Sequence, residues 1–254
     1  MALASERLDG AHAVVTGGGR GIGREAALAL AGLGAKVTLV ARSGDELEAV
    51  AAEIAGAGGE AATRTADVAD PAQVEAAISA ATEWSPVSVL VTAAGLNRVG
   101  PAADYATEDW NTLMEVNVSG TFYACRAVGR RLIERGEPGR IVTVSSQMGS
   151  VGFPGRAAYC ATKHAVNGLT KALAVEWAPH GIAVNAVAPT FVLTPLTKPM
   201  FEDAEFAADV AARIPDGELA TLEDVAGAIA FLAGDRARSV TGHVLGVDRG
   251  WTAW

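Results

Sequence analysis

Side chains that bind metals or react with oxidants are scarce in this 254-residue chain. It contains two cysteines, Cys125 and Cys160, and four histidines. Neither cysteine belongs to a CxxC or Cys/His cluster, and the histidines are scattered along the chain. We therefore expect no catalytic metal, and a packing role for Cys160.

Long apolar runs, basic runs and a leader segment are missing as well. No stretch is long and uninterrupted enough to span a bilayer, and residues 1–10 lack the basic and apolar regions of a signal peptide. The net charge is −9 and no basic cluster occurs, so neither nucleic acid nor an anionic membrane is an expected partner. The resulting expectation is a cytoplasmic protein.

Apolar strands alternate with helical segments along the whole sequence, of which half the residues are hydrophobic. The predicted strands cover residues 12–16, 36–41, 61–66, 87–92, 141–145, 183–187 and 243–247. The predicted helices cover residues 24–33, 43–57, 71–82, 107–134, 156–178 and 222–233. This alternation implies parallel strands covered on both faces. It predicts a single α/β domain over residues 1–254, with a Rossmann-type doubly wound parallel sheet of about seven strands and ligand sites at the carboxyl strand ends.

A glycine-rich turn, Gly-Gly-Gly-Arg-Gly-Ile-Gly at residues 17–23, follows the first predicted strand and precedes a helix. Glycines let the backbone approach an anion, and the free N–H groups at a helix start stabilise its charge. The spacing is T-G-x-x-x-G-I-G rather than G-x-G-x-x-G, with Gly17, Gly21 and Gly23 in the key places. The pattern predicts a phosphate site, and a merely flexible loop is the less favoured alternative.

Tyr159 and Lys163 lie four residues apart in a predicted helix. Side chains at this spacing share one face, and a neighbouring cation favours the phenolate over the phenol. Such a tyrosine is suited to proton transfer near neutral pH. Ser146 stands thirteen residues upstream of Tyr159, at the end of an apolar run. Taken alone, the pair also fits a surface tyrosine beside a solvated lysine.

Asn117 lies within an apolar helical pattern, where asparagine is mildly unfavourable unless its amide has a partner. Taken alone, it fits a hydrogen-bonding residue of the core. Together with the glycine turn and the serine–tyrosine–lysine set, in this order, it makes the sequence similar to the classical short-chain dehydrogenase/reductase family. The resemblance extends over residues 16–250.

This resemblance implies reversible hydride transfer between nicotinamide C4 and a carbonyl or secondary alcohol carbon, with the cofactor supplying the redox chemistry. Tyr159 then donates a proton to the developing alkoxide, and Ser146 donates a hydrogen bond to the same oxygen. Lys163 is implied to keep the pKa of Tyr159 low and to bind the nicotinamide ribose, and Asn117 to hold a water that links Lys163 to solvent. The thirteen-residue interval selects Ser146 over Ser145, which is expected to be a structural neighbour.

The residue that ends the second predicted strand discriminates between the two nicotinamide dinucleotides. An acid there would accept hydrogen bonds from the ribose 2′-OH, whereas arginine would neutralise a 2′-phosphate. This strand ends on Arg42, and Arg20 of the glycine turn can approach the same phosphate. Asp45 and Glu46 are nearby acids, but the capping-box spacing from Ser43 assigns them to a helix start. NADP(H) is favoured and NAD(H) stays open, since a solvated surface Arg42 is the alternative.

The family pattern also assigns cofactor contacts further along the chain. Asp67 follows the third strand, where the family's aspartate contacts the adenine amine, and capping of the next helix is its alternative role. The expected cofactor residues are Gly17, Gly19, Arg20, Gly21, Ile22, Arg42, Asp67, Val68, Ala94, Gly95, Tyr159, Lys163, Val192 and Thr194.

Three segments depart from the family pattern. Thr92-Ala93 precedes Ala94-Gly95 where the family has asparagines, which removes hydrogen bonds within the sheet and leaves the chemistry intact. Thr190 replaces a glycine in the segment that meets the nicotinamide carboxamide, where the local turn is expected to differ. Arg249 replaces a glycine near the end of the chain, in a segment that lies at a subunit interface in the family.

Substrate contacts are expected next to the catalytic segments, from Gln147, Phe153 and Phe191. Residues 194–216 contain three prolines and are predicted to form a mobile lid. Residues 95–97 and 250–254 resemble the branch of gluconate 5-dehydrogenase and 2-deoxygluconate dehydrogenase, which implies a sugar acid or a polyol as the substrate. We expect Trp251 and Trp254 to be buried near the lid of a neighbouring subunit.

Two other functions compete with this interpretation. A 3-oxoacyl-thioester reductase of the same family would need a basic docking patch for an acidic carrier protein, which the acidic charge balance mildly disfavours. A non-catalytic dinucleotide sensor with the same fold would typically lack the tyrosine or the lysine, and both are present here.

The long predicted helices carry apolar residues on more than one side, such as Leu113 and Phe122 with Val118 in the helix over residues 107–134. A helix covered only by its own sheet needs one apolar stripe, and further apolar surface indicates an interface. We expect a homotetramer, with one two-fold interface through the long helices and another through the last helix and strand. A thickly covered core helix is the alternative.

Overall fold

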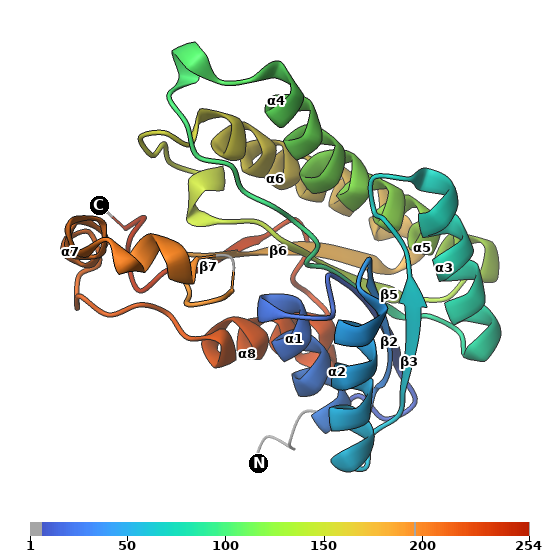
Figure 1. The fold of residues 1–254 in the computed structure, drawn as a ribbon. Helices are drawn as coiled ribbons and strands as arrows, with labels where there is room; N and C mark the ends of the chain where they lie inside the picture. Colours follow the sequence, from blue (N-terminus) through green and yellow to red (C-terminus); the bar gives the residue numbers. More distant parts are fainter. Residues whose placement is uncertain (1–6, 196, 254) are drawn as a thin grey trace.

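Seven strands form one parallel sheet in the computed structural model, which describes residues 7–195 and 197–253 (Figure 1). The strands are β1 (His12–Thr16), β2 (Lys36–Ala41), β3 (Ala61–Thr65), β4 (Val89–Thr92), β5 (Gly139–Val144), β6 (Ile182–Pro189) and β7 (Val244–Val247). Their order is β3-β2-β1-β4-β5-β6-β7, so the chain reverses direction across the sheet between β1 and β4. The predicted doubly wound fold is confirmed.

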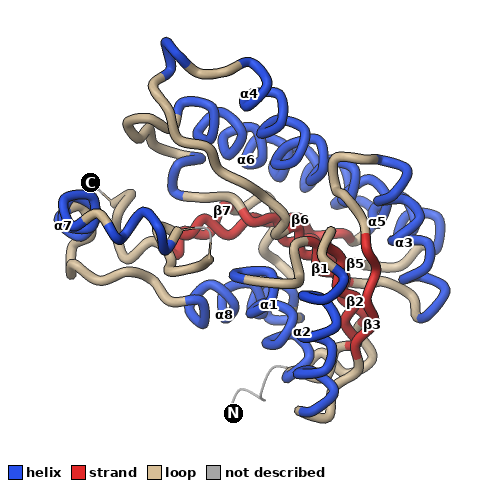
Figure 2. The backbone as a smooth tube through the Cα atoms, viewed as in Figure 1, coloured by secondary structure: helices blue, strands red, loops and turns tan. Residues whose placement is uncertain are grey.

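Helices cover both faces of this sheet (Figures 1 and 2). One layer contains α1 (Gly21–Gly32), α2 (Gly44–Gly56) and α8 (Leu222–Ala233). The other contains α3 (Pro71–Trp84), α5 (Gly120–Arg135) and α6 (Ala157–Trp177). No helix within residues 7–195 and 197–253 is long and apolar enough to cross a membrane.

The central strand β1 separates two apolar cores. Val15 packs with side chains of α1, α2 and α8, whereas Val14 packs with side chains of α3, α5 and α6, and both valines are fully buried. Successive side chains of a strand point to opposite faces, so an uninterrupted apolar run is what a strand covered on both sides requires. The continuous burial of β1 and β6 explains why these segments were recognisable as strands.

The helix predicted over residues 107–134 has a π-helical segment in its middle, which the prediction did not include. Helix α4 (Thr107–Leu113) passes into π-helical turns at Met114–Ser119 and then into α5. Segments of this kind are rare and often occur at functional sites. Asn117 lies within it, so the site of the irregularity coincides with a predicted catalytic residue.

The predicted lid, residues 194–216, contains regular structure rather than an open loop. A 3₁₀ turn at Lys198–Glu202 is followed by α7 (Ala204–Ala212), whose first turn is capped by the Asp203 carboxylate. Helix α7 lies beyond β7, at the opposite end of the sheet from β3 (Figure 1). The lid therefore stands over the carboxyl ends of β6 and β7.

Candidate active site

The glycine turn after β1 is closely packed. Gly17 has a φ of +69°, and a Cβ added to it would lie 2.7 Å from the backbone nitrogen of Ala94. A Cβ on Gly23 would lie 2.2 Å from the carbonyl oxygen of Gly17. The N–H of Gly17 also donates to the Val40 carbonyl at 2.7 Å. These contacts need glycine at both positions, so the turn has a defined shape and is not a flexible loop.

A cleft opens between this turn and the ends of β2, β3 and β4, at the topological switch point where open α/β sheets bind ligands. Eleven of the expected cofactor residues line it, namely Gly17, Gly19, Arg20, Gly21, Ile22, Arg42, Asp67, Val68, Ala94, Gly95 and Thr194. Gly23 of the predicted phosphate turn lines it as well, and the sequence prediction missed Ala41, Ser43, Glu46, Ala66, Ala93, Leu96, Val116 and Pro195. Most of these residues are next to a predicted one in the sequence, and this proximity was the signal that could have identified them. The other three expected residues, Tyr159, Lys163 and Val192, are not among its lining, and Val192 is 3% exposed within the core.

The mouth of the cleft carries two arginine–carboxylate pairs. Arg42 Nη1 lies 3.9 Å from Asp67 Oδ2, and Arg20 Nη1 lies 3.7 Å from Glu46 Oε1. Both arginine side chains are largely exposed, so these pairs are weak. The guanidinium groups are therefore free to turn towards an anionic ligand in the cleft.

The capping box predicted from Ser43 to Glu46 is wrong. The Ser43 side chain makes no capping hydrogen bond, although Asp45 and Glu46 do lie in the first turn of α2. Glu46 instead lines the cleft beside Arg20. The expected place of both acids at the helix start is therefore observed, and Glu46 lines the cleft from that position.

Asp67 does not cap the next helix, which was the alternative role for it. The α3 helix is capped by Asp70, whose Oδ1 accepts from the Ala72 and Gln73 N–H groups at 2.8 and 3.3 Å. Asp67 Oδ1 accepts from Ala69 N at 3.0 Å and its carboxylate lines the cleft. Its place agrees with the predicted adenine contact.

The two consecutive serines after β5 have different surroundings. Ser145 Oγ donates to Asn167 Oδ1 at 2.6 Å and is 2% exposed, so it acts within the protein interior. Ser146 Oγ donates to Gln147 Oε1 at 3.0 Å and accepts from Met148 N at 3.2 Å. The Ser146 hydroxyl also acts to lower the pKa of Tyr159 through a side-chain hydrogen bond. This arrangement supports the selection of Ser146 as the reactive serine.

Tyr159 and Lys163 share one face of α6, as their spacing predicted. Lys163 Nζ lies 5.5 Å from the centre of the Tyr159 ring and donates to the Val144 carbonyl at 2.8 Å. Burial raises the pKa of Tyr159 to about 12 and lowers the pKa of Lys163 to about 8. The pKa of Tyr159 is raised because burial outweighs the lowering by the Ser146 hydroxyl and Arg156, and the effect of Lys163 on this pKa stays a prediction. At neutral pH Tyr159 holds its proton.

Asn117 connects the segment after β4 to α6. Its Oδ1 accepts from Leu96 N at 2.9 Å, and its Nδ2 donates to Leu96 O at 2.9 Å and to Thr162 Oγ1 at 3.2 Å. Both amide hydrogens are used by protein groups, and the side chain is 1% exposed. The structural role that was the alternative for Asn117 is thus the one observed, and the water link to Lys163 stays a prediction.

An aromatic cluster lies beside Tyr159 on the substrate side. The ring centres of Phe153 and Phe191 are 5.7 Å apart, and Phe206 and Trp251 pack against both of them. Trp251 is 8% exposed and packs within its own chain, so its expected burial is observed, and its position near a neighbouring subunit's lid stays a prediction. Trp254 lies outside the described residues.

The segments that depart from the family pattern adopt ordinary structure with one exception. Thr190 donates its N–H to Val247 O at 3.2 Å and needs no positive φ. Arg249, with a φ of +49°, is the single non-glycine residue with positive φ in the described part of the chain. Its guanidinium binds Asp216 at 3.0 Å and Glu218 at 2.9 Å, which ties the end of the lid to the segment after β7.

The described residues form no cluster typical of a metal site. Within the described ranges, no three His, Cys, Asp or Glu side chains are arranged to hold a metal ion.

Known proteins resemble the chain over almost its whole length. Residues 17–252 match a family model described as enoyl-(acyl carrier protein) reductase. D-threitol dehydrogenase of Mycolicibacterium smegmatis is 40% identical, over 97% of this chain and 94% of that protein. Galactitol 2-dehydrogenase (L-tagatose-forming) of Cereibacter sphaeroides is 42% identical, over 98% of this chain and 97% of that protein.

The chain belongs to the short-chain dehydrogenase/reductase family. Among solved structures, gluconate 5-dehydrogenase from Burkholderia cenocepacia, in complex with NADP and tartrate, has a TM-score of 0.94 at 36% identity and covers 98% of this chain and 97% of that chain. The predicted resemblance to the gluconate 5-dehydrogenase branch is confirmed. The protein is an oxidoreductase of this family that acts on alcohol groups, and the family uses NAD(P).

Proposed function

We propose that this protein interconverts a secondary alcohol and a ketone on a sugar acid or polyol, with NADP(H) as the preferred cofactor. The observation that supports it most directly is that Lys163, which lies beside the Tyr159 ring, has its Nζ 3.9 Å from a Cβ built on Gly95 in the lining of the cleft. We further propose that residues 1–254 act as a single domain whose residues 194–216 open and close over the substrate.

The cleft fits a dinucleotide. Backbone at Gly17 and Gly23 comes too close to its neighbours to leave room for any side chain, which is the packing that a pyrophosphate-binding turn requires. Arg20 and Arg42 stand at the mouth, where they would hold a 2′-phosphate, and Asp67 would hold the adenine. Thr194 would contact the nicotinamide end, and Val192 would do so through its backbone. When bound, NADP(H) supplies the hydride chemistry.

Side chains of the protein transfer the proton. Tyr159 is protonated at neutral pH and donates to the oxygen of the substrate carbonyl as that oxygen becomes negative. Ser146 donates a hydrogen bond to the same oxygen, and its alternative partner Gln147 holds the hydroxyl in place beforehand. Lys163 and Arg156 are the cations near the phenol, and in alcohol oxidation they stabilise the phenolate.

A paired substrate screen tests the proposal. Purified protein is mixed with NADPH or NADH and a series of ketones, including keto-sugars, keto-sugar acids and 3-oxoacyl thioesters, and oxidation of the reduced nicotinamide is followed by absorbance. We expect turnover with keto-sugars or keto-sugar acids and a preference for NADPH. Turnover of 3-oxoacyl thioesters alone would favour the acyl-carrier reductase alternative, and cofactor binding without turnover of any carbonyl would favour the sensor.

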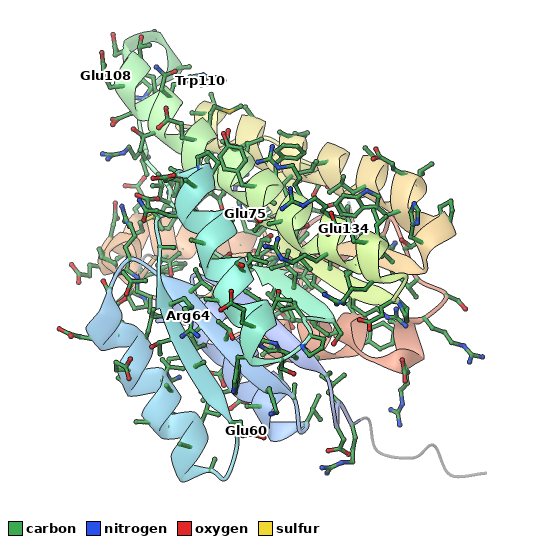
Figure 3. The ribbon with its side chains drawn as sticks, turned by 90° about the vertical axis from the view of Figure 1, so that its right-hand side faces the viewer. Glu60, Arg64, Glu75, Glu108, Trp110 and Glu134 are labelled. Atoms are coloured by element: carbon green, nitrogen blue, oxygen red, sulfur yellow. The ribbon has the colours of Figure 1, made fainter. Side chains whose placement is uncertain are left out.

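The proposal includes a homotetramer. Three large apolar side chains are exposed on the helices predicted to form its interfaces: Trp110 on α4, Val175 on α6 and Phe231 on α8. Trp110 lies near the free end of its helix, beside Glu108 (Figure 3). Exposed apolar groups on both predicted contact faces support two kinds of interface. Light scattering at micromolar concentration should return four chain masses, and a monomer mass would contradict both interfaces. A cytoplasmic location stays a prediction, tested by fractionation of cell extracts.

A further inference from the structure

Buried polar atoms that lack a hydrogen-bond partner within the described residues gather at the carboxyl edge of the sheet. Of the seven residues that carry such atoms, five lie at or just beyond the carboxyl ends of β4, β5 and β6, or on the approach to α6. They are Thr92, Asn97, Gln147, Arg156 and Thr190. Buried polar groups are normally paired, so this concentration marks the place where a ligand supplies the missing partners.

Arg156 stands out among these five residues because it is charged. Its side chain is 3% exposed, and neither Nε nor Nη1 has a partner. Nη2 contacts the Met200 sulfur at 2.9 Å, and a thioether is a weak acceptor. Burial lowers the pKa of Arg156, and the titratable groups that face it are Tyr159, Cys160 and Tyr105, none of which is a carboxyl group. A buried cation without a counter-charge is costly to the folded protein.

The position of Arg156 in the fold increases this cost. It immediately precedes the first residue of α6, where the helix dipole presents its positive end and disfavours a cation. No packing need explains a guanidinium in this place, because an apolar side chain would fill the same volume without the charge. The unpaired charge is therefore better explained by a ligand than by stability.

Arg156 also faces the reaction centre. It precedes Tyr159 by three residues, and its positive charge acts to lower the pKa of that phenol. Met200, in the 3₁₀ turn of the lid, covers it from one side. The loop after β4 borders it on another, where Gly100 N donates to Gly155 O at 3.1 Å. The guanidinium is thus enclosed by the lid, the loop after β4 and α6, together with the acid that protonates the substrate.

We propose that Arg156 binds the carboxylate of the substrate and makes the enzyme select a sugar acid over the neutral polyol of the same carbon chain. This inference rests on the proposed oxidoreductase function and refines it. The two oxygens of a carboxylate accept two parallel N–H bonds from one edge of a guanidinium. Nη2 belongs to both such edges, so the carboxylate takes the place of the Met200 sulfur. The ligand then supplies the missing counter-charge and lies next to the lid.

Arg213 provides a matched control. It also lies on the substrate side, with its guanidinium 5.3 Å from the centre of the Phe153 ring. In contrast to Arg156, it already has a counter-charge, because Nη2 lies 3.1 Å from Asp209 Oδ1. Removing either arginine lowers the local positive charge by the same amount, but Arg213 is half-exposed and already paired, whereas Arg156 is buried and has no carboxylate partner.

The test compares D-gluconate with D-sorbitol, which share a carbon chain and differ in one terminal carboxylate. With the NADP(H)-loaded enzyme, binding is measured by protection from thermal unfolding and, where turnover occurs, by kcat/KM. We expect the wild type to prefer gluconate by roughly tenfold to a hundredfold, which is the range of a charge-assisted hydrogen-bonded contact. The Arg156→Met variant should lose this preference, Arg156→Lys should keep part of it, and Arg213→Gln should keep it whole.

Equal binding of gluconate and sorbitol by the wild type, or a preference that survives in Arg156→Met, overturns the inference while leaving the proposed function in place. The inference is also overturned if Arg213→Gln abolishes the preference for gluconate as fully as Arg156→Met does, because the overall positive charge near the site would then be its cause. If gluconate binding depends on Arg156 but no alcohol or ketone is turned over, the proposed function fails and the inference stands. Should Arg156→Met not fold, the graded loss in Arg156→Lys and the wild-type comparison still decide the matter.

Discussion

The cofactor cleft and the aromatic cluster around Tyr159 are built from different kinds of structure. The cleft is formed by short segments that directly follow β1, β2, β3 and β4, with glycine and alanine backbone as its floor. The substrate side is closed by large side chains from distant segments, such as Phe153, Phe191 and Trp251. One half depends on the absence of side chains, and the other depends on their packing.

This difference predicts how each half responds to substitution. At Gly17 and Gly23 of the cleft, adding a single carbon atom is enough to cause a clash, because backbone already contacts backbone there. On the substrate side, tertiary packing positions the rings, and a change there alters which molecule fits. Substitutions at individual residues of each half test this division.

Tyr159→Phe should abolish most turnover. The phenol supplies the proton, and general acid catalysis of this kind contributes roughly 10²–10⁴-fold to a rate. NADP(H) binding should stay nearly intact, since the cleft is formed by other segments. Steady-state kinetics and cofactor titration measure the two effects, with Tyr123→Phe on α5 as the control. Substantial activity of the variant at any pH would remove Tyr159 as the acid.

Gly23→Ala should disable the cofactor half while leaving the fold recognisable. The added Cβ would lie 2.2 Å from the Gly17 carbonyl oxygen, and overpacking of this sort costs about 1–3 kcal/mol. Gly32→Ala in the same helix is the control, because nothing lies within 4 Å of its added Cβ. That change should stabilise the protein by up to about 1 kcal/mol. Denaturant unfolding and NADP(H) titration should separate the two variants, and equal behaviour would contradict the close-packed turn.

Raising the pH should stabilise the wild type relative to Lys163→Met. Burial lowers the Lys163 pKa from 10.5 to about 8. Between these values the unfolded chain binds more protons than the folded one, so stability rises with pH. From pH 7 to 9.5 the gain should be about 2 kcal/mol. Tyr159, whose pKa is raised from 10.0 to about 12, lowers stability only above pH 10. If the wild type and Lys163→Met differ in free energy of unfolding by the same amount at both pH values, burial does not destabilise the charged Lys163.

Arg42→Asp should shift cofactor preference towards NAD(H). The carboxylate would repel a 2′-phosphate and accept from a free ribose hydroxyl, with an effect of roughly tenfold or more in affinity. Arg24→Gln is the control, because Arg24 is paired with Glu53 and does not line the cleft. Equal titration curves of the wild type for the two cofactors would contradict the assignment of Arg42.

Much of the cofactor half was predictable because its residues are contiguous. The strand, the glycine turn and the helix follow one another within residues 12–32, so their spacing alone indicated a phosphate site. Glu46 lies at the helix start as expected, but its second place in the lining of the cleft was missed because the capping pattern describes only hydrogen bonds to neighbouring residues. The π-helical segment around Asn117 was missed for a related reason, since its apolar spacing is that of a helix.

What the sequence determined by itself is the order of buried strands and helices, the glycine turn and the spacing of Ser146, Tyr159 and Lys163, because each rests on local geometry. The tertiary structure decided the protonation of the site, since burial by distant segments raises the pKa of Tyr159 and lowers that of Lys163. It also decided that Trp251 packs on its own chain, and that Arg156 is buried without a counter-charge. Burial and pairing depend on which segments meet in space, and residue spacing carries no information about that.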